Sequence, residues 1–360
     1  MENLEIKKNF FWNNKTVLVT GHTGFKGSWL CFYLNYLGCN VIGYSLKPNK
    51  NHKLFSILNI KDKLKFNLFS NIENKKKLSE VIKKYNPEII FHLAAQPLVI
   101  DSYKDPKGTI DTNIIGTINL LEIAKMNNKI KSIVIVTSDK CYKVKQDKTY
   151  YFNEESELGG LDPYSASKAC TEILTNSYVK SFFNQSKKFA PRVSTVRSGN
   201  ILGGGDWGQY RLITDIINAK TNKTKLKIRN LESVRPWIHV LDTLTGYIKI
   251  AKKNYETNKF VGPWNFSPLD KKPRRVKKIV EYCVKNNFLD KKQINVTKTK
   301  YHETKVLMLD SRKANEYLKW KPKLNFNEVL NYTFDWYAAY RKKENMEKYT
   351  INQIKEFLKK

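Results

Sequence analysis

Short apolar runs recur along the first half of the chain, and longer stretches of mixed polar and apolar residues separate them. Each run is rich in β-branched residues, which is typical of a strand buried on both faces. The runs predict strands over 16–20, 41–44, 88–93, 132–137 and 194–197. The stretches between them predict helices over 24–37, 73–85, 108–127 and 164–183. Because strands and helices alternate, we expect an α/β fold with a doubly wound parallel sheet.

The pattern becomes irregular after Asn200, where glycine, tryptophan and arginine residues come close together. This change predicts a smaller C-terminal lobe that binds a substrate beside the sheet. We expect a first domain over 1–199, to which part of 237–266 returns, and a lobe made of 200–236 and 267–345. Residues 346–360 are expected to be a C-terminal tail with a short amphipathic helix.

The composition is ordinary for a globular protein, with 41% hydrophobic and 27% charged residues. No apolar run approaches the ~20 residues of a membrane span, and the N-terminus lacks the apolar core of a signal peptide. The five cysteines and five histidines are scattered, which favours free thiols over disulfides or a metal site. We therefore predict a cytoplasmic protein without a membrane segment or a bound metal.

The formal net charge of +32 invites an interpretation as a nucleic-acid-binding protein. Only nine of the 65 basic residues are arginine, however, and the lysines are spread over the predicted surface helices. Specific nucleic-acid surfaces use arginine for base edges and clustered charge for phosphates. We therefore expect no nucleic-acid partner, while a positive surface suits an anionic, phosphate-bearing small substrate.

A glycine motif, Gly21-x-x-Gly24-x-x-Gly27, joins the first predicted strand to the first helix. Glycines there permit a tight turn and let a pyrophosphate approach the free N–H groups of the helix. The motif predicts a Rossmann dinucleotide site. The second strand lacks the acidic residue that accepts the ribose 2′-hydroxyl of NAD, and Lys47 follows it, so the residues alone leave NAD and NADP open.

Acid–base residues form a second constellation. Tyr164 and Lys168 lie four residues apart on a predicted helix and so share one face. A cation there is expected to lower the pKa of the phenol, which can then act as a base toward a hydroxyl. Ser138, Asp139 and Lys140 follow the strand over 132–137. Because alcohol oxidation alone does not need Asp139 and Lys140, these residues indicate a second proton transfer, such as elimination of water.

Taken together, these segments resemble the extended short-chain dehydrogenase/reductases of the NAD-dependent epimerase/dehydratase family, and within it the branch of CDP-glucose 4,6-dehydratases. The resemblance covers nearly the whole chain and rests on residues 20–30, 92–99, 137–142, 162–165, 199–207 and 235–240. Related dTDP-glucose dehydratases carry Thr-Asp-Glu where this chain has Ser138-Asp139-Lys140, and the lysine favours the CDP-sugar branch. One departure is Asn71, in Ser70-Asn71-Ile72, where relatives often have Gly-Asp-Ile beside the adenine.

The resemblance implies NAD as the cofactor and conversion of CDP-glucose to CDP-4-keto-6-deoxyglucose and water. In that reaction carbon 4 is oxidised, water is eliminated across carbons 5 and 6, and the hydride returns to carbon 6. Tyr164, held as a phenolate by Lys168, would remove the 4-hydroxyl proton while Ser138 orients the same oxygen. Asp139 would protonate the departing 6-hydroxyl. Lys140 would act either as the base at carbon 5 or as a cation that stabilises the enolate.

The resemblance also implies the contacts of both ligands and a homodimer or homotetramer. The expected cofactor contacts are Gly21, Thr23, Gly24, Phe25, Lys26, Gly27, Ser45, Asn71, Ile72, Leu93, Ala94, Ala95, Asn113, Thr137, Tyr164 and Lys168. The expected substrate contacts are Gln96, Asn200, Trp207, Arg211 and Arg235. The two arginines suit a pyrophosphate. Asn113 is expected to bend its helix beside the site, and His22 and His92 to pack in the interior; His302-Glu303 is only a weak motif.

Three other functions remain open from the sequence. A dTDP- or GDP-sugar 4,6-dehydratase would use the same residues with another nucleotide. A nucleotide-sugar 4-epimerase needs the Tyr164/Lys168 pair but no acid for a leaving hydroxyl, so Asp139 and Lys140 argue against it. A catalytically silent NAD- or RNA-binding protein would not need Ser138, Tyr164 and Lys168 together.

Overall fold

The computed structural model describes residues 11–144, 151–183, 190–228, 230–268, 272, 274–297 and 307–360; His302 and Glu303 lie outside them. Seven strands form one sheet in the order β11-β7-β5-β4-β1-β2-β3, and all neighbouring strands are parallel. The strands are β1 (Thr16–Thr20), β2 (Asn40–Ser45), β3 (Phe66–Phe69), β4 (Ile89–His92), β5 (Ser132–Val136), β7 (Arg192–Ser198) and β11 (Gly262–Phe266). The predicted doubly wound parallel sheet is confirmed.

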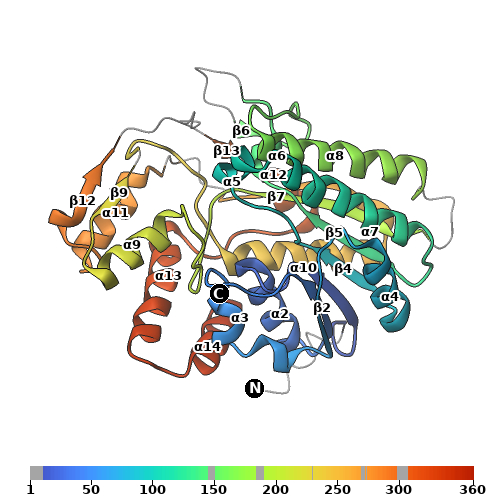
Figure 1. Ribbon diagram of the computed structural model, residues 1–360, viewed down its shortest axis with the longest axis horizontal. Helices are drawn as coiled ribbons and strands as arrows, with labels where there is room; N and C mark the ends of the chain where they lie inside the picture. The colour runs from blue at the N-terminus through green and yellow to red at the C-terminus, as the bar shows by residue number, and fades with distance from the viewer. Residues whose placement is uncertain are drawn as a thin grey trace.

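Successive side chains of the central strands enter two separate cores, one on each face of the sheet. Val17 and Val19 belong to one hydrophobic cluster, and Leu18 belongs to the other, as the two-residue period of a strand requires. Helices α2 (Phe25–Tyr36) and α10 (Val240–Glu256) contribute to the first cluster. Helices α4 (Lys75–Tyr85) and α7 (Gly116–Lys125) contribute to the second, and α8 (Pro163–Ser181) packs on α7 (Figure 1).

The helix predicted over 108–127 is interrupted. Helix α6 (Pro106–Ile110) passes into a π-helical turn at Asp111–Ile115, and α7 begins at Gly116. Asn113 lies in this turn, which agrees with the expected bend. A short helix, α5 (Val99–Lys104), and α3 (Lys53–Ile57) lie in other connections between the strands and helices of the sheet.

A lobe beside the sheet is built from segments that the hydrophobic pattern did not resolve into elements. It contains α9 (Leu212–Asn222), β9 (Leu226–Ile228), α11 (Val276–Lys285) and β12 (Ile294–Val296), and β9 pairs with β12 in parallel. Figure 1 places this lobe to the left of the sheet. A parallel pair, β8 (Ile201–Leu202) with β10 (Ile238–His239), lies where the chain leaves the sheet for the lobe and returns from it.

The C-terminal segment contains α12 (Arg312–Leu318), α13 (Phe326–Arg341) and α14 (Met346–Lys359); strands β6 (Tyr151–Phe152) and β13 (Met308–Leu309) pair in parallel nearby. Helix α14 packs on α13 and buries Ile354 and Phe357 completely. The expected amphipathic helix is therefore present, and it covers part of the first core. Among the described residues, no helix is long and apolar enough to cross a membrane.

Candidate active site

The glycine motif forms one wall of a cavity of about 430 Å³ at the carboxyl ends of β1, β2 and β4. Gly21 has φ +73°, and a Cβ there would meet the backbone of Leu93 and Ala94 at 2.7 Å. Helix α2 starts after Gly24 without a side-chain cap, so its first N–H groups remain available to an anion. Sheet order reverses at β1, which is where open α/β sheets bind dinucleotides.

The structure brings most of the expected cofactor residues to this cavity. Its lining includes Gly21, Thr23, Gly24, Phe25, Lys26, Gly27, Ser45, Asn71, Ile72, Leu93, Ala94 and Ala95. At the end of β2, Thr23 Oγ1 lies 2.9 Å from Ser45 Oγ, so a hydroxyl pair stands where relatives often have an acid. Lys47 is exposed and does not line the cavity. The two hydroxyls of Thr23 and Ser45 can hydrogen-bond a ribose at the end of β2.

Asn113 and Lys168 lie behind the cavity walls instead. The Asn113 side chain accepts from Gln96 N at 2.8 Å and donates to Ser167 Oγ at 2.8 Å. Lys168 is buried, and its Nζ donates to the Val136 carbonyl oxygen at 3.3 Å. Gln96, expected to contact the substrate, lies on the cofactor side, where Thr109 and Asn113 hold it.

A second cavity of about 310 Å³ opens at the carboxyl end of β5. The chain leaves β5 in a single 3₁₀ turn over Asp139–Cys141, and Ser138 Oγ donates to Asp139 Oδ1 at 2.9 Å. Tyr164 enters from the start of α8, where Asp162 caps the helix and Pro163 occupies its first turn. Thr137, Ser138, Asp139, Lys140 and Tyr164 all line this cavity. The structure therefore brings the predicted acid–base residues together, with Lys168 behind them.

Burial sets the protonation of these groups. It raises the pKa of Tyr164 to about 12, against our expectation of a lowered value. It also lowers the pKa of Lys168 to about 8. The predicted one-turn spacing is present, with Lys168 Nζ 6.0 Å from the centre of the Tyr164 ring. Burial raises the pKa of the Tyr164 phenol more than the Ser138 hydrogen bond and the Arg211 charge lower it.

Asp139 is buried, and burial raises the pKa of its carboxyl group although Lys140 and the Ser138 hydrogen bond oppose the shift. Its Oδ2 atom makes no hydrogen bond with the part of the chain that the structure describes. A buried carboxyl group without a partner for one oxygen favours the protonated form. This environment suits a carboxyl group that acts as an acid toward the cavity.

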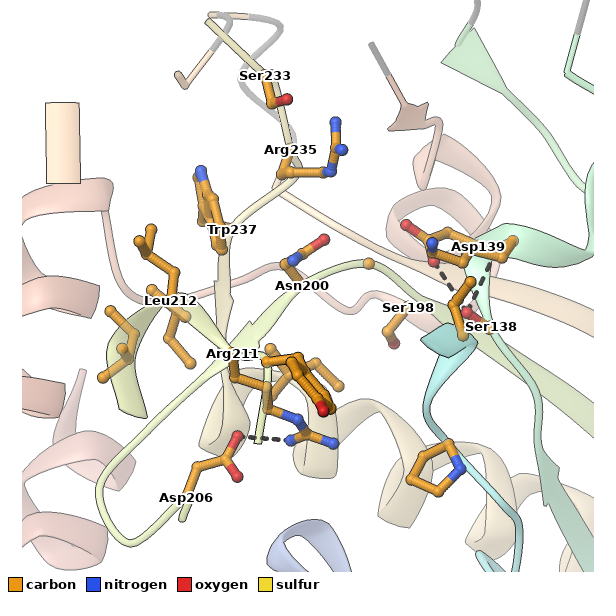
Figure 2. Close-up of a pocket in the computed structure, with 18 of the residues that line it drawn as sticks. Ser138, Asp139, Ser198, Asn200, Asp206, Arg211, Leu212, Ser233, Arg235 and Trp237 are labelled. Carbon is orange, nitrogen blue, oxygen red and sulfur yellow. Dashed lines mark hydrogen bonds and ion pairs between the residues drawn. The ribbon is translucent and has the colours of Figure 1, made fainter. Parts of the chain in front are cut away.

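The two cavities share a wall made of Phe25, Lys26, Pro97, Asp206 and Arg211. Arg211 Nη1 forms an ion pair with Asp206 Oδ2 at 2.5 Å, which raises the pKa of Arg211 (Figure 2). Burial, together with Lys168 and Arg211, lowers the pKa of Lys26 to about 7. The two cavities therefore adjoin each other across this shared wall.

The C-terminal half supplies the far side of the second cavity. Figure 2 shows Asn200, Arg235 and Trp237 to the left of Ser138 and Asp139. Trp207 lies outside this cavity, in a neighbouring hollow where Lys53 Nζ is 5.0 Å from its ring centre. Residues that sequence reasoning missed also line the cavity: Ser198, Asp206, Tyr210, Lys227, Asn230 and Ser233. Ser198 directly precedes the quoted segment 199–207 and Asp206 lies within it, a signal that was available; the others carried none.

His22 and His92 are interior residues. His92 Nδ1 lies 2.8 Å from Thr20 Oγ1, and burial lowers its pKa to about 3. His22 Nε2 lies 2.5 Å from Asn67 Oδ1, and burial lowers its pKa to about 4. Both rings are therefore neutral at pH 7, in line with the predicted packing roles. No group of three or more potential metal ligands occurs among the described residues.

Comparison with known proteins identifies the family. The family model described as GDP-mannose 4,6 dehydratase matches residues 18–333. The chain belongs to this dehydratase family. The curated CDP-glucose 4,6-dehydratase of Salmonella typhimurium (strain LT2) is 40% identical over 356 residues, which is 98% of each chain. The resemblance drawn from the motifs is thereby confirmed.

Solved structures of dehydratases and epimerases share the fold. The dTDP-glucose 4,6-dehydratase of Bacillus anthracis, in complex with NAD, is 25% identical with a TM-score of 0.75 and covers 91% of this chain and 98% of its own. The UDP-glucose 4-epimerase of Thermotoga maritima, solved with UDP-glucose, has a TM-score of 0.78 at 21% identity and covers 91% of this chain and 99% of its own. The second match shows the fold alone.

Proposed function

We propose that this chain is a CDP-glucose 4,6-dehydratase with NAD as its cofactor. The observation that carries the proposal is the placement of Asp139, a buried carboxyl group whose raised pKa suits an acid, in the same cavity as Tyr164 and Ser138. The full-length similarity to the Salmonella enzyme supports CDP-glucose over other nucleotide sugars. The dTDP-glucose 4,6-dehydratase of Bacillus anthracis, solved in complex with NAD, supports NAD as the cofactor.

Each acid–base residue has a separate role in this proposal. The residues of the glycine motif would hold NAD, which would supply the hydride acceptor for carbon 4 and the hydride donor for carbon 6. Tyr164 takes the proton of the 4-hydroxyl, and Ser138 donates a hydrogen bond to the same oxygen. Lys168 holds positive charge behind Tyr164, which favours its phenolate form. Asp139 gives its proton to the departing 6-hydroxyl, so that water leaves.

Lys140 lines the cavity beside Asp139 and faces the sugar in this proposal. It serves either as the base that removes the carbon-5 proton or as the cation that stabilises the enolate left behind. The carbon-5 proton is replaced after the hydride returns to carbon 6, so the net change is loss of one water. No cofactor is consumed.

Arg211 and Arg235 enter the second cavity and supply positive charge for the substrate pyrophosphate, with Asn200 as a further donor. We expect the domain over 1–199, with part of 237–266, to hold NAD, and the lobe over 200–236 and 267–345 to complete the substrate cavity. We also place the enzyme in the cytoplasm as a homodimer or homotetramer, which size-exclusion chromatography with light scattering would test.

The test of the function is incubation of the purified protein with NAD and CDP-glucose, and in parallel with dTDP-glucose and GDP-mannose. Loss of one water by mass spectrometry, together with the alkaline absorbance of a 4-keto product, is expected for CDP-glucose alone. Loss of water from another nucleotide sugar would support the dehydratase reaction but contradict the assignment of cytidine as the nucleoside of the substrate. An epimerised nucleotide sugar without loss of water would contradict the assignment as a dehydratase.

A further inference from the structure

A buried carboxylate lies one helical turn beyond Lys168. Glu172 is on α8, and its side chain is 3% exposed. The carboxylate accepts four hydrogen bonds: from Thr137 Oγ1 at 2.5 Å, Thr195 Oγ1 at 2.6 Å, and Arg197 Nε and Nη2 at 2.8 Å each. Neither the motifs nor the cavity linings single out this residue.

These hydrogen bonds connect the end of strand β5 to helix α8, and each of these elements carries part of the acid–base site. Thr137 directly precedes Ser138 and Asp139 at the end of β5, whereas α8 carries Tyr164 and Lys168. The Glu172 side chain therefore connects helix α8, which carries Tyr164, to the turn after β5, which carries Asp139. A fully satisfied buried network of this kind holds its members in one arrangement.

The same carboxylate faces Lys168. Residues four apart on a helix are neighbours, and the Glu172 charge opposes the effect of burial on the pKa of Lys168. The other titratable groups around Lys168 are Tyr164 on α8, His92 on β4, Cys141 after β5 and Lys26 on α2, with Arg197 of β7 beyond Glu172. Burial keeps Cys141 a neutral thiol and His92 a neutral ring. Glu172 is thus the negative charge in this set.

Arg197 extends the network away from the cavity. Its Nη1 donates to Tyr142 Oη at 2.7 Å, and Tyr142 Oη donates to Asn265 Oδ1 at 2.8 Å. Tyr142 stays outside both cavities. The network therefore has a Glu172 end near Lys168 and a Tyr142–Asn265 end that contacts neither cavity.

We infer that Glu172 is a positioning residue for the oxidation step: it fixes the Ser138–Asp139 turn against α8 and supplies the negative charge opposite the Lys168 ammonium. This inference rests on the proposed function. It predicts that Glu172 affects the pH dependence of hydride transfer more than the binding of the nucleotide sugar, because its side chain does not line the substrate cavity.

The test compares Glu172→Gln with the wild type in single turnovers with NAD and CDP-glucose, followed by the absorbance of the reduced cofactor. The wild-type rate should fall as pH rises through about 8, where Lys168 loses its proton. The Gln variant should show this fall about one pH unit lower, and so a roughly fivefold lower rate at pH 8 that approaches tenfold above pH ~9. The KM for CDP-glucose should stay unchanged.

Tyr142→Phe is the matched control, because it removes a hydrogen bond from the other end of the network and leaves Glu172 and Lys168 intact. It should lower thermal stability without moving the pH profile. If Glu172→Gln does not fold, the double variant Glu172→Gln/Arg197→Met avoids an unpaired buried charge and should show the same acid shift.

An unmoved pH profile in the folded Glu172 variant, with lower stability only, would overturn the inference, and so would equal shifts in the Glu172 and Tyr142 variants. A wild-type protein that reduces no cofactor with any nucleotide sugar would overturn the proposed function, and the inference with it.

Discussion

At the scale of single residues, Asp139 shows how position decides chemistry. Its carboxyl group is buried, one oxygen accepts from Ser138 and the other has no partner among the described residues. The ionisable pair after the strand indicated a second proton transfer, and the family resemblance implied that Asp139 is the acid. It did not predict the degree of burial, which depends on Gly199 and Pro236 from distant parts of the chain: a Cβ on Gly199 would lie 3.2 Å from Asp139 Oδ2.

Asp139→Asn should separate the two half-reactions. The amide cannot donate an acidic proton to the leaving hydroxyl, so elimination should slow by ~10²–10⁴-fold, the usual range for a lost general acid. Oxidation at carbon 4 should persist, and reduced cofactor should build up in stopped-flow traces. Normal water loss in this variant, measured by mass, would contradict the assignment.

Two substitutions at Lys140 should distinguish its alternative roles. Lys140→Ala should lose elimination and keep oxidation under either role. Lys140→Arg keeps the positive charge but cannot become a neutral base. Recovery of elimination by arginine would therefore support enolate stabilisation, and equal loss in both variants would support the base. Near-normal elimination in the Ala variant would contradict both roles.

At the scale of elements, strands and helices of the sheet follow from local pattern, whereas interruptions and short elements do not. The run at 16–20 is β1 to the residue, because a buried parallel strand needs continuous apolar side chains on both faces. Strands β8 and β10 have two residues each and carry no periodicity to detect. The regular helix expected over 108–127 contains a π-helical turn. Residue spacing does not reveal this turn, but the resemblance of Asn113 to the asparagine of the family predicts a bend there.

Asn113→Ala should weaken this turn. The buried amide makes hydrogen bonds to the backbone of Gln96 and to Ser167, and its loss leaves those groups unsatisfied. We expect a loss of about 1–3 kcal/mol in the free energy of unfolding and weaker NAD binding, measured by urea titration and calorimetry. Asn119→Ala on neighbouring α7, a less buried amide, is the control and should change both quantities less. Equal effects would indicate that the turn has no special role.

At the scale of the whole molecule, the second cavity is assembled from segments far apart in the sequence. Tyr164 and Arg235 line the same space, yet no local pattern relates them. The sequence predicted the chemistry of the site and most of the cofactor wall, since those residues sit in contiguous motifs. Trp207 and Gln96, expected to contact the substrate, do not line the second cavity, because tertiary contacts decide which cavity a side chain enters.

Asp242 links the stability of the molecule to pH. Its carboxylate accepts from the backbone N–H groups of Lys323 and Leu324, and burial raises its pKa to about 7. The folded state therefore binds a proton more strongly than the unfolded state, whose pKa is near ~3.9. This contribution to stability is full below pH ~4 and is lost as pH rises through about 7.

Asp242→Asn should flatten the decline in stability over that pH range, as measured by urea unfolding at several pH values. The exposed Asp62→Asn should leave the wild-type slope unchanged. The same decline in the Asp242 variant as in the wild type would assign the pH dependence to other groups.

The position of β11 in the sheet has a consequence for biosynthesis. Strand β11 pairs with β7, but the whole segment over 199–261 is translated between them. A nascent chain folding from its N-terminus therefore displays β7 as an unpaired edge while the ribosome adds that segment. An open strand edge is a template for pairing with another chain. Translational pauses after β7 should accordingly increase co-aggregation of nascent chains, and pauses after Phe266 should not.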